Sequence, residues 1–253
     1  MLPTLCQTCY TVAIMTSLLD FDMPWVSPYA CLDLFRNPFG ELSRSERAEL
    51  ASIELQDCLR SIGTGRSMLQ ILGPCGYGKT THLLAMERAL VDAPYVYFPE
   101  DRHQPVLPRA RPLLVDEAQR MSWRRKRELL RSSGPLILGT HADFSKPFSR
   151  AGFEVTTIDL TEPVTTVRLQ QILNRRIVAS RLPPTERPLD NRPLDDSSLN
   201  NRPLVEPSRL DEVHRLSLSL VQVQALQEKF GNNVRGMEDH LYEIIQQMVD
   251  SQV

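Results

Sequence analysis

The residues best suited to chemistry lie in one short glycine-rich stretch. Residues 73–80 read Gly-Pro-Cys-Gly-Tyr-Gly-Lys-Thr, a complete match to the phosphate-binding pattern of two glycines followed by Lys and Thr. Glycines allow backbone N–H groups to surround phosphate oxygens. Lys79 would reach the outer phosphates, and the Thr80 hydroxyl would hold Mg2+. The predicted ATP contacts are Gly73, Pro74, Cys75, Gly76, Tyr77, Gly78, Lys79, Thr80 and Thr81.

The flanks of this stretch supply the context that the pattern requires. Residues 67–72 form an apolar run typical of a buried strand, and residues 81–90 have apolar side chains at helical spacing. The order strand, glycine loop, helix places the loop at a helix N-terminus, which favours an anion. The sequence therefore predicts a nucleoside triphosphate site.

A second candidate motif follows a later apolar run. Residues 113–115 read Leu-Leu-Val and predict a buried strand, directly followed by Asp116 and Glu117. The carboxyl ends of strands form the ligand-binding edge of open α/β sheets. Asp116 would hold Mg2+ through water, and Glu117 would polarise the attacking water. The pair favours hydrolysis over phosphoryl transfer to a small acceptor.

The order of elements predicts an α/β fold. Five strands, separated by helices or loops, predict a parallel sheet flanked by helices; they lie at 67–72, 95–98, 113–117, 136–140 and 154–160. One helix is expected over 46–62, preceded by a Ser43–Glu46 capping pattern, and another over 119–131. Three further helical segments are expected at 164–181, 208–230 and 232–249.

This change of pattern divides the chain. Residues 1–35 lack periodicity and predict a poorly ordered extension without a structural role. Residues 36–160 would form the nucleotide-binding α/β domain, and residues 161–253 a small all-helical lid domain. Within the lid, residues 183–207 repeat Arg-Pro-Leu and are rich in Pro, Asp, Asn and Ser, which predicts a disordered insert.

Composition places few limits on partners. The 253 residues carry a formal charge of -2, so global electrostatics argue neither for nor against an anionic partner. No run approaches the roughly 18 apolar residues of a membrane span. The first Lys or Arg is Arg36, so the apolar residues 11–19 lack the positive flank of a signal peptide. A cytoplasmic location is expected, with reduced cysteines that include Cys6 and Cys9.

Taken together, these motifs resemble the AAA+ ATPases, over about residues 36–249. In that family a polar sensor residue ends the strand after Asp-Glu, which implies Thr140 or His141 here. An arginine before the fifth strand reaches the nucleotide of a neighbouring subunit, which implies Arg150 and a homo-oligomer. An arginine at the start of a lid helix returns to the phosphates, which implies Arg235.

The object on which such an ATPase would act is left open between DNA and a protein. In the expected helix 120–131, Arg120, Arg124, Arg127 and Arg131 recur at helical spacing beside Trp123. Such a face suits DNA phosphates, and it equally suits a solvated basic surface. Two interpretations remain: an ATP-hydrolysing AAA+ switch, or a nucleotide-dependent regulatory or scaffold module with little or no turnover.

Overall fold

The computed structural model describes residues 27–53, 55–60, 62, 65–101, 104–109, 111–182 and 216–251. The expected disordered insert, most of the expected N-terminal extension and the Cys6–Cys9 pair lie outside these residues.

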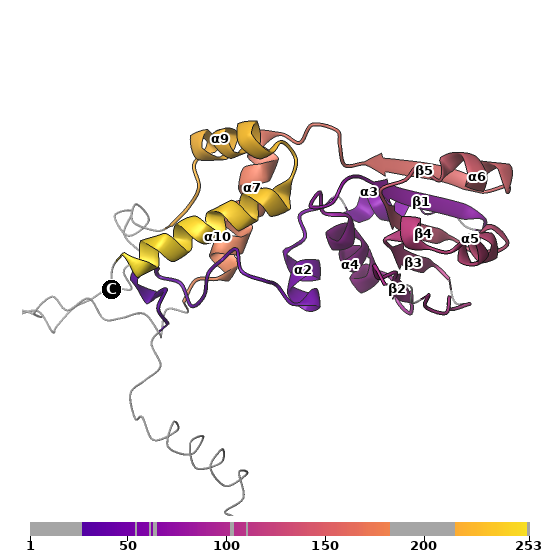
Figure 1. The fold of residues 1–253 in the computed structure, drawn as a ribbon, viewed down its shortest axis with the longest axis horizontal. Coiled ribbons are helices and arrows are strands. Elements are labelled where there is room, and N and C mark those ends of the chain that lie inside the picture. The colour runs from indigo at the N-terminus through magenta and orange to yellow at the C-terminus, as the bar shows by residue number, and fades with distance from the viewer. Residues whose placement is uncertain are drawn as a thin grey trace, which may run out of the picture.

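A five-stranded, entirely parallel sheet forms the centre of the α/β part (Figure 1). Its strands are β1 (Ser67–Leu72), β2 (Tyr95–Tyr97), β3 (Leu113–Asp116), β4 (Leu136–Thr140) and β5 (Glu154–Asp159). Their order across the sheet is β2-β3-β4-β1-β5. The predicted α/β class and parallel sheet are confirmed.

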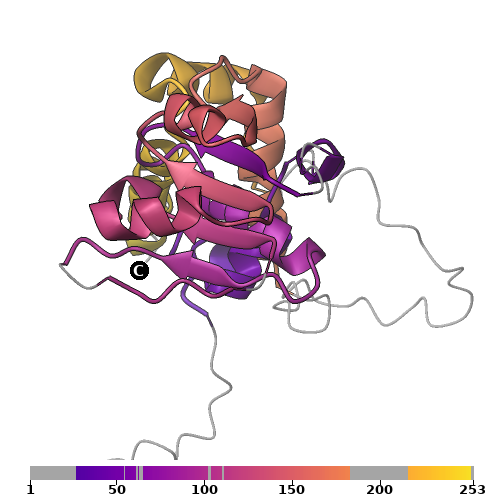
Figure 2. The same cartoon turned by 90° about the vertical axis from the view of Figure 1, so that its right-hand side faces the viewer.

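Helices cover both faces of the sheet (Figure 2). On one face, Leu129 of α5 (Trp123–Leu130) and Phe148 of α6 (Ser145–Arg150) join the buried cluster. On the other face, Cys58 of α3 (Leu55–Arg60) and Leu83 of α4 (Lys79–Ala89) pack against the same strands. Because β3 and β4 are buried at every position, each begins with the apolar run that identified it, 113–115 and 136–138.

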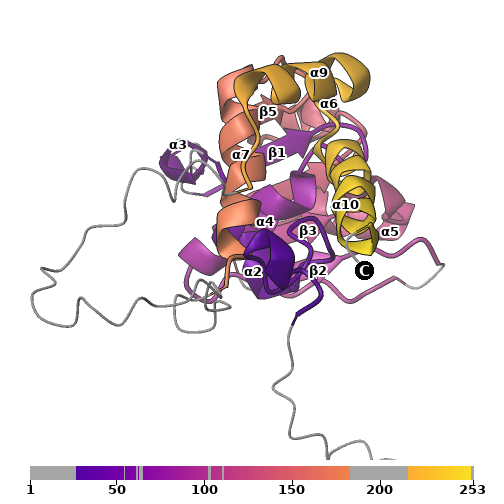
Figure 3. The same cartoon turned by 90° about the vertical axis from the view of Figure 1, so that its left-hand side faces the viewer.

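A separate helical unit lies beside the α/β part (Figures 1 and 3). It contains α7 (Thr166–Ala179), α9 (Leu220–Phe230) and α10 (Val234–Asp250), which share one apolar core. Side chains of this core include Leu169, Leu173, Ile177, Val223, Leu226, Met237, Leu241 and Ile245.

The segment that precedes the sheet belongs to this helical unit. Residues 27–35, expected to have no structural role, include the short 3-10 helix η1 (Ala30–Leu32) and contribute Leu34 to the helical core. Phe39 joins the same core, and Arg176 donates hydrogen bonds to the carbonyls of Pro38 and Gly40. The structural boundary therefore differs from the predicted domain start at residue 36.

The predicted helix over 46–62 is wrong. The capping box of Ser43 and Glu46 is present, but α2 (Arg44–Leu50) ends before α3 begins. Two arginines of α7 donate hydrogen bonds to backbone carbonyls at the end of α2 and just after it. Arg175 donates to those of Glu49 and Ala51, and Arg168 donates to that of Ser52. Carbonyls satisfied from another element no longer need a continuous helix.

The predicted helix over 119–131 is also divided. A 3-10 turn, η2 (Ala118–Arg120), comes first, and Ser122 then caps α5 by accepting a hydrogen bond from the N–H of Arg125. Arg120 consequently lies outside α5, so the predicted stripe of four arginines on one helix loses its first member.

No helix within the described ranges is both long and apolar enough to cross a membrane.

Candidate active site

The topology brings three loops to one edge of the sheet. Strand β4 lies between β1 and β3, so the carboxyl ends of all three strands are neighbours. The chain leaves β1 for the far edge strand β2, whereas it leaves β4 in the opposite direction, past β1, to β5. Connections that diverge from neighbouring strands mark the point where ligands bind in open α/β sheets. The glycine loop, residues 73–78, lies at this point.

The glycine loop ends at an open helix N-terminus. Gly76 and Gly78 have φ angles of 85° and 89°, values that side chains with a Cβ rarely adopt. Gly78 is the N-cap of α4 and supplies no side-chain hydrogen bond to it. The first N–H groups of α4 therefore remain available to an anion.

Lys79 is a buried cation that no carboxylate of the described residues contacts directly. The residue is only 4% exposed, and its Nζ donates a hydrogen bond to the carbonyl of Pro74 at 2.8 Å. No carboxylate of the described residues lies within 4.0 Å of this nitrogen. Burial lowers the pKa of Lys79, and the nearby charge of Glu117 opposes this shift. An anion in the loop would compensate the buried ammonium group.

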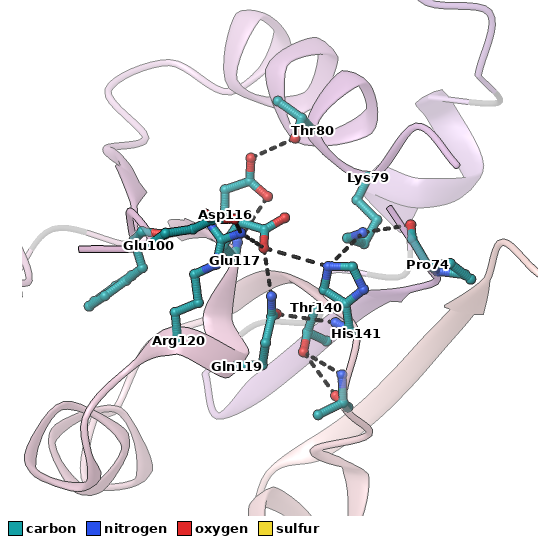
Figure 4. Close-up of polar contacts among 12 residues, drawn as sticks. Pro74, Lys79, Thr80, Glu100, Asp116, Glu117, Gln119, Arg120, Thr140 and His141 are labelled. Carbon is teal, nitrogen blue, oxygen red and sulfur yellow. Dashed lines mark hydrogen bonds and ion pairs between the residues drawn. The ribbon is translucent and has the colours of Figure 1, made fainter. Parts of the chain in front are cut away.

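Asp116 is fully buried, and its carboxylate accepts three hydrogen bonds. Its Oδ2 accepts from the Thr80 hydroxyl at 2.8 Å and from the Tyr95 hydroxyl at 2.7 Å. Its Oδ1 accepts from the N–H of Glu117 at 3.0 Å. A Cβ at Gly139 would approach Oδ1 to 2.9 Å, so glycine leaves the space that the carboxylate occupies. The arrangement fixes one carboxylate beside Thr80, as Figure 4 shows.

Glu117 adopts an unusual backbone conformation at the end of β3. Its φ of 55° and ψ of 42° lie in the left-handed region, which costs a non-glycine residue about 1–2 kcal/mol. The carboxylate accepts from Nε2 of Gln119 at 2.6 Å and lies 3.3 Å from the guanidinium of Arg120 (Figure 4). Strained residues of this kind concentrate at functional sites.

The two candidates for the sensor position differ in where they point. Thr140 is fully buried, and its hydroxyl exchanges hydrogen bonds with the backbone of Ala142. His141 instead places its Nε2 3.5 Å from Nζ of Lys79 and 3.5 Å from the carboxylate of Glu117. Figure 4 shows the imidazole between these two groups. Only His141 contacts the charged side chains of the site.

The start of α10 lies against the glycine loop. The N–H of Arg235 donates to the carbonyl of Gly76 at 3.3 Å. A Cβ built on Gly76 would lie 2.2 Å from Oδ1 of Asn233, the N-cap of α10, and 3.2 Å from Cβ of Arg235. The helical unit and the glycine loop are thus in direct contact, with the exposed Arg235 side chain beginning at that contact.

Arg150 lies away from the other candidates. It ends α6, just before the amino end of β5, whereas the glycine loop follows the carboxyl end of β1. Because β1 and β5 are parallel, Arg150 and the loop occupy opposite ends of the sheet. This exposed arginine is not part of the site formed by its own chain.

Sequence reasoning missed four residues that shape the site. Tyr95 fixes Asp116, Gln119 and Arg120 hold Glu117, and Asn233 contacts Gly76. Tyr95 precedes Asp116 by 21 residues, and only the pairing of β2 with β3 brings them together. Gln119 and Arg120 lie close to Asp116-Glu117 in the sequence, which could have indicated their contact with Glu117. They were instead assigned to the expected continuous helix over 119–131.

No protein-family model matches the sequence, and no curated protein matches it. The geometry of the site carries the functional interpretation.

Proposed function

We propose that this protein binds ATP with Mg2+ and hydrolyses it, as an AAA+-like molecular switch. The buried Lys79, which no carboxylate of the described residues contacts directly, at the open N-terminus of α4 carries the proposal. A phosphate chain in the glycine loop would receive N–H groups from α4 and positive charge from Lys79 together. The 73–80 pattern supplies the glycines that make this approach possible.

The residues present fit a magnesium ion shared with the phosphates. The described residues contain no cluster of three or more His, Cys, Asp or Glu side chains suited to a metal. Mg2+ commonly uses one or two protein oxygens, with water and substrate phosphates completing its shell. Thr80 would supply one such oxygen, and Asp116, which accepts a 2.8 Å hydrogen bond from Thr80, would hold the ion through water. When bound, the ion neutralises charge on the phosphates.

The remaining site residues have distinct proposed roles. Glu117 would orient and polarise the attacking water, because its carboxylate stands at the end of β3 beside Asp116. His141, between Lys79 and Glu117, would respond to the outer phosphate as the sensor. Arg235 would close on the phosphates from α10, whose first turn contacts the glycine loop.

Regulation between subunits is part of this proposal. Arg150 is exposed at the end of the sheet opposite its own glycine loop, so it could serve only the site of a neighbouring copy. A homo-oligomer in which Arg150 completes an adjacent site follows from the resemblance to AAA+ ATPases. The work of the switch would be directed at DNA or at a protein partner.

One observation favours a second function. The Glu117 carboxylate is occupied by Gln119 and Arg120, at 2.6 Å and 3.3 Å. With both contacts kept, fewer acceptor positions of this carboxylate are free to take a proton from water. A regulatory or scaffold module, which binds ATP with little turnover and changes its affinity for a partner, matches this arrangement.

Steady-state ATP hydrolysis by the wild type and by Glu117→Gln separates the two functions. Hydrolysis predicts wild-type turnover that Glu117→Gln abolishes while ATP binding persists. Glu154→Gln, at an exposed position at the start of β5, is the matched control and should keep wild-type turnover. Tight ATP binding without turnover in the wild type would support the regulatory module. Turnover by Glu117→Gln at the wild-type rate would remove Glu117 from its role.

A further inference from the structure

The outward face of α5 carries a feature that ATP chemistry does not use. We call Trp123, Arg124, Arg127 and Arg131 the Trp123 surface. Trp123 is 69% exposed, and the guanidinium of Arg127 lies over its ring at 5.2 Å from the centroid. Together with Glu128, these residues line an open depression of about 360 Å3. An indole left in water at a helix start adds nothing to the core.

Positive charge on this surface is largely uncompensated. Residues 124–131 include five basic side chains and one acidic side chain, Glu128. Arg125 binds Glu128 at 2.8 Å and so occupies the single carboxylate. Within the described ranges, Arg124, Arg127 and Arg131 have no carboxylate oxygen within 4.0 Å. Three guanidinium groups therefore face solvent without an ion-pair partner.

The inner side of α5 holds this surface in place. Leu129 is completely buried in the core beneath the helix, and Ser122 caps its first turn. Lys126 lies over the ring of Phe144, the residue before α6, at 5.1 Å from the centroid. Since these contacts fix α5, the exposed ring and the arginines keep a defined mutual arrangement.

The combination of a ring and guanidinium groups indicates one class of ligand. Single-stranded nucleic acid offers unpaired bases that stack on aromatic rings and phosphates that bind arginine. The helix rises about 12 Å between positions 123 and 131. This length gives room for more than one phosphate of a strand that runs along the helix. An acidic peptide would satisfy the charges, but its carboxylate side chains do not stack on the indole.

We propose that the Trp123 surface binds single-stranded nucleic acid. A base stacks on the indole of Trp123 on the side away from Arg127, and neighbouring phosphates bind Arg124 and Arg131. The surface does not include residues 73–80, Asp116 or Glu117. Binding is therefore independent of the proposed ATP hydrolysis, and either property can fail without the other.

Fluorescence anisotropy of a labelled thymidine oligonucleotide with the full chain tests this proposal. Trp123→Ala should weaken binding about 5- to 150-fold, the usual loss for one stacked base, while Trp123→Phe retains most of the affinity. The double variant Arg124→Gln/Arg131→Gln should reduce the slope of log affinity against log salt by about 1.4, as expected for two lost phosphate contacts.

The matched control removes two charges elsewhere. Arg88→Gln/Lys229→Gln changes exposed positions on α4 and α9 and should leave both affinity and slope near wild type. Circular dichroism spectra establish that each variant is folded. Polyglutamate of equal charge, used as a competitor, represents an acidic protein and should compete poorly.

Three results would overturn the proposal. These are no binding of the oligonucleotide by the wild type, equal binding by folded Trp123→Ala and wild type, or displacement by polyglutamate as effective as that by unlabelled oligonucleotide. Equal binding by Trp123→Ala would mean that the ring contributes nothing, and effective displacement by polyglutamate would mean that the surface is a general polyanion site.

Discussion

The hydrogen bond from Tyr95 to Asp116 offers a sharp test of how the site is held. The hydroxyl donates to Oδ2 of a fully buried carboxylate at 2.7 Å. Burial raises the pKa of Tyr95, and the negative charge of Asp116 raises it further, so the hydroxyl stays protonated and keeps donating at neutral pH. Tyr95→Phe would remove this donor and leave the ring in place.

The expected loss follows from the type of hydrogen bond. A hydrogen bond to a charged group contributes about 1.5–3 kcal/mol. Tyr95 is only partly buried, so water can replace part of the interaction, and we expect the lower end, about 1.5 kcal/mol. This corresponds to about a tenfold change in the unfolding equilibrium constant. The free energy of unfolding, measured with urea, reports it directly.

Tyr97→Phe is a matched control on the same strand. Tyr97 is exposed, and its hydroxyl accepts only a 3.2 Å hydrogen bond from Arg120. Its replacement should change the free energy of unfolding by no more than about 0.5 kcal/mol. Equal stability of Tyr95→Phe and Tyr97→Phe would refute the reasoning. Isothermal titration should also show weaker Mg-dependent ATP binding in Tyr95→Phe alone, because Asp116 is less firmly positioned.

Two further predictions concern packing and acid stability. Gly139→Ala should destabilise the fold by about 1–3 kcal/mol, because the new Cβ would lie 2.9 Å from Oδ1 of Asp116. It should also weaken Mg-dependent ATP binding. Unchanged urea unfolding and ATP titration would contradict this close packing. The hydrogen bond from Ser43, followed by that from Arg36, lowers the pKa of Glu46 to about 2. Its stabilising effect is therefore present above about pH 4.5 and is lost as the pH falls toward 2. Thermal melting across this range should show the advantage of the wild type over Glu46→Gln disappearing; a constant difference would argue against the lowered pKa.

The part of the site that follows local patterns was predictable from sequence. Strand β1, the glycine loop and α4 follow one another directly, so the local pattern was enough to predict that Lys79 and Thr80 lie at a helix start. The apolar run of β3 likewise predicted Asp116 and Glu117 at a strand end. Each of these inferences depends on residues within a few positions of one another.

Features that depend on distant contacts were not predictable in this way. The break between α2 and α3 is held by Arg168 and Arg175, over 100 residues away in sequence. Leu34 reads as part of an unpatterned segment because its partners lie on α7, α9 and α10. Similarly, the contact of His141 rather than Thr140 with Lys79 depends on how the turn after β4 directs each side chain.

ATP binding to the wild type and to Lys79→Ala, measured by isothermal titration in the presence of Mg2+, tests the central claim most directly. Lys146→Ala, at an exposed lysine on α6, serves as the matched control, and circular dichroism verifies folding. The proposed site predicts binding by the wild type and by Lys146→Ala, and its loss in Lys79→Ala. Equal ATP affinity in folded Lys79→Ala and wild type would contradict the assignment of residues 73–80 as the nucleotide-binding loop.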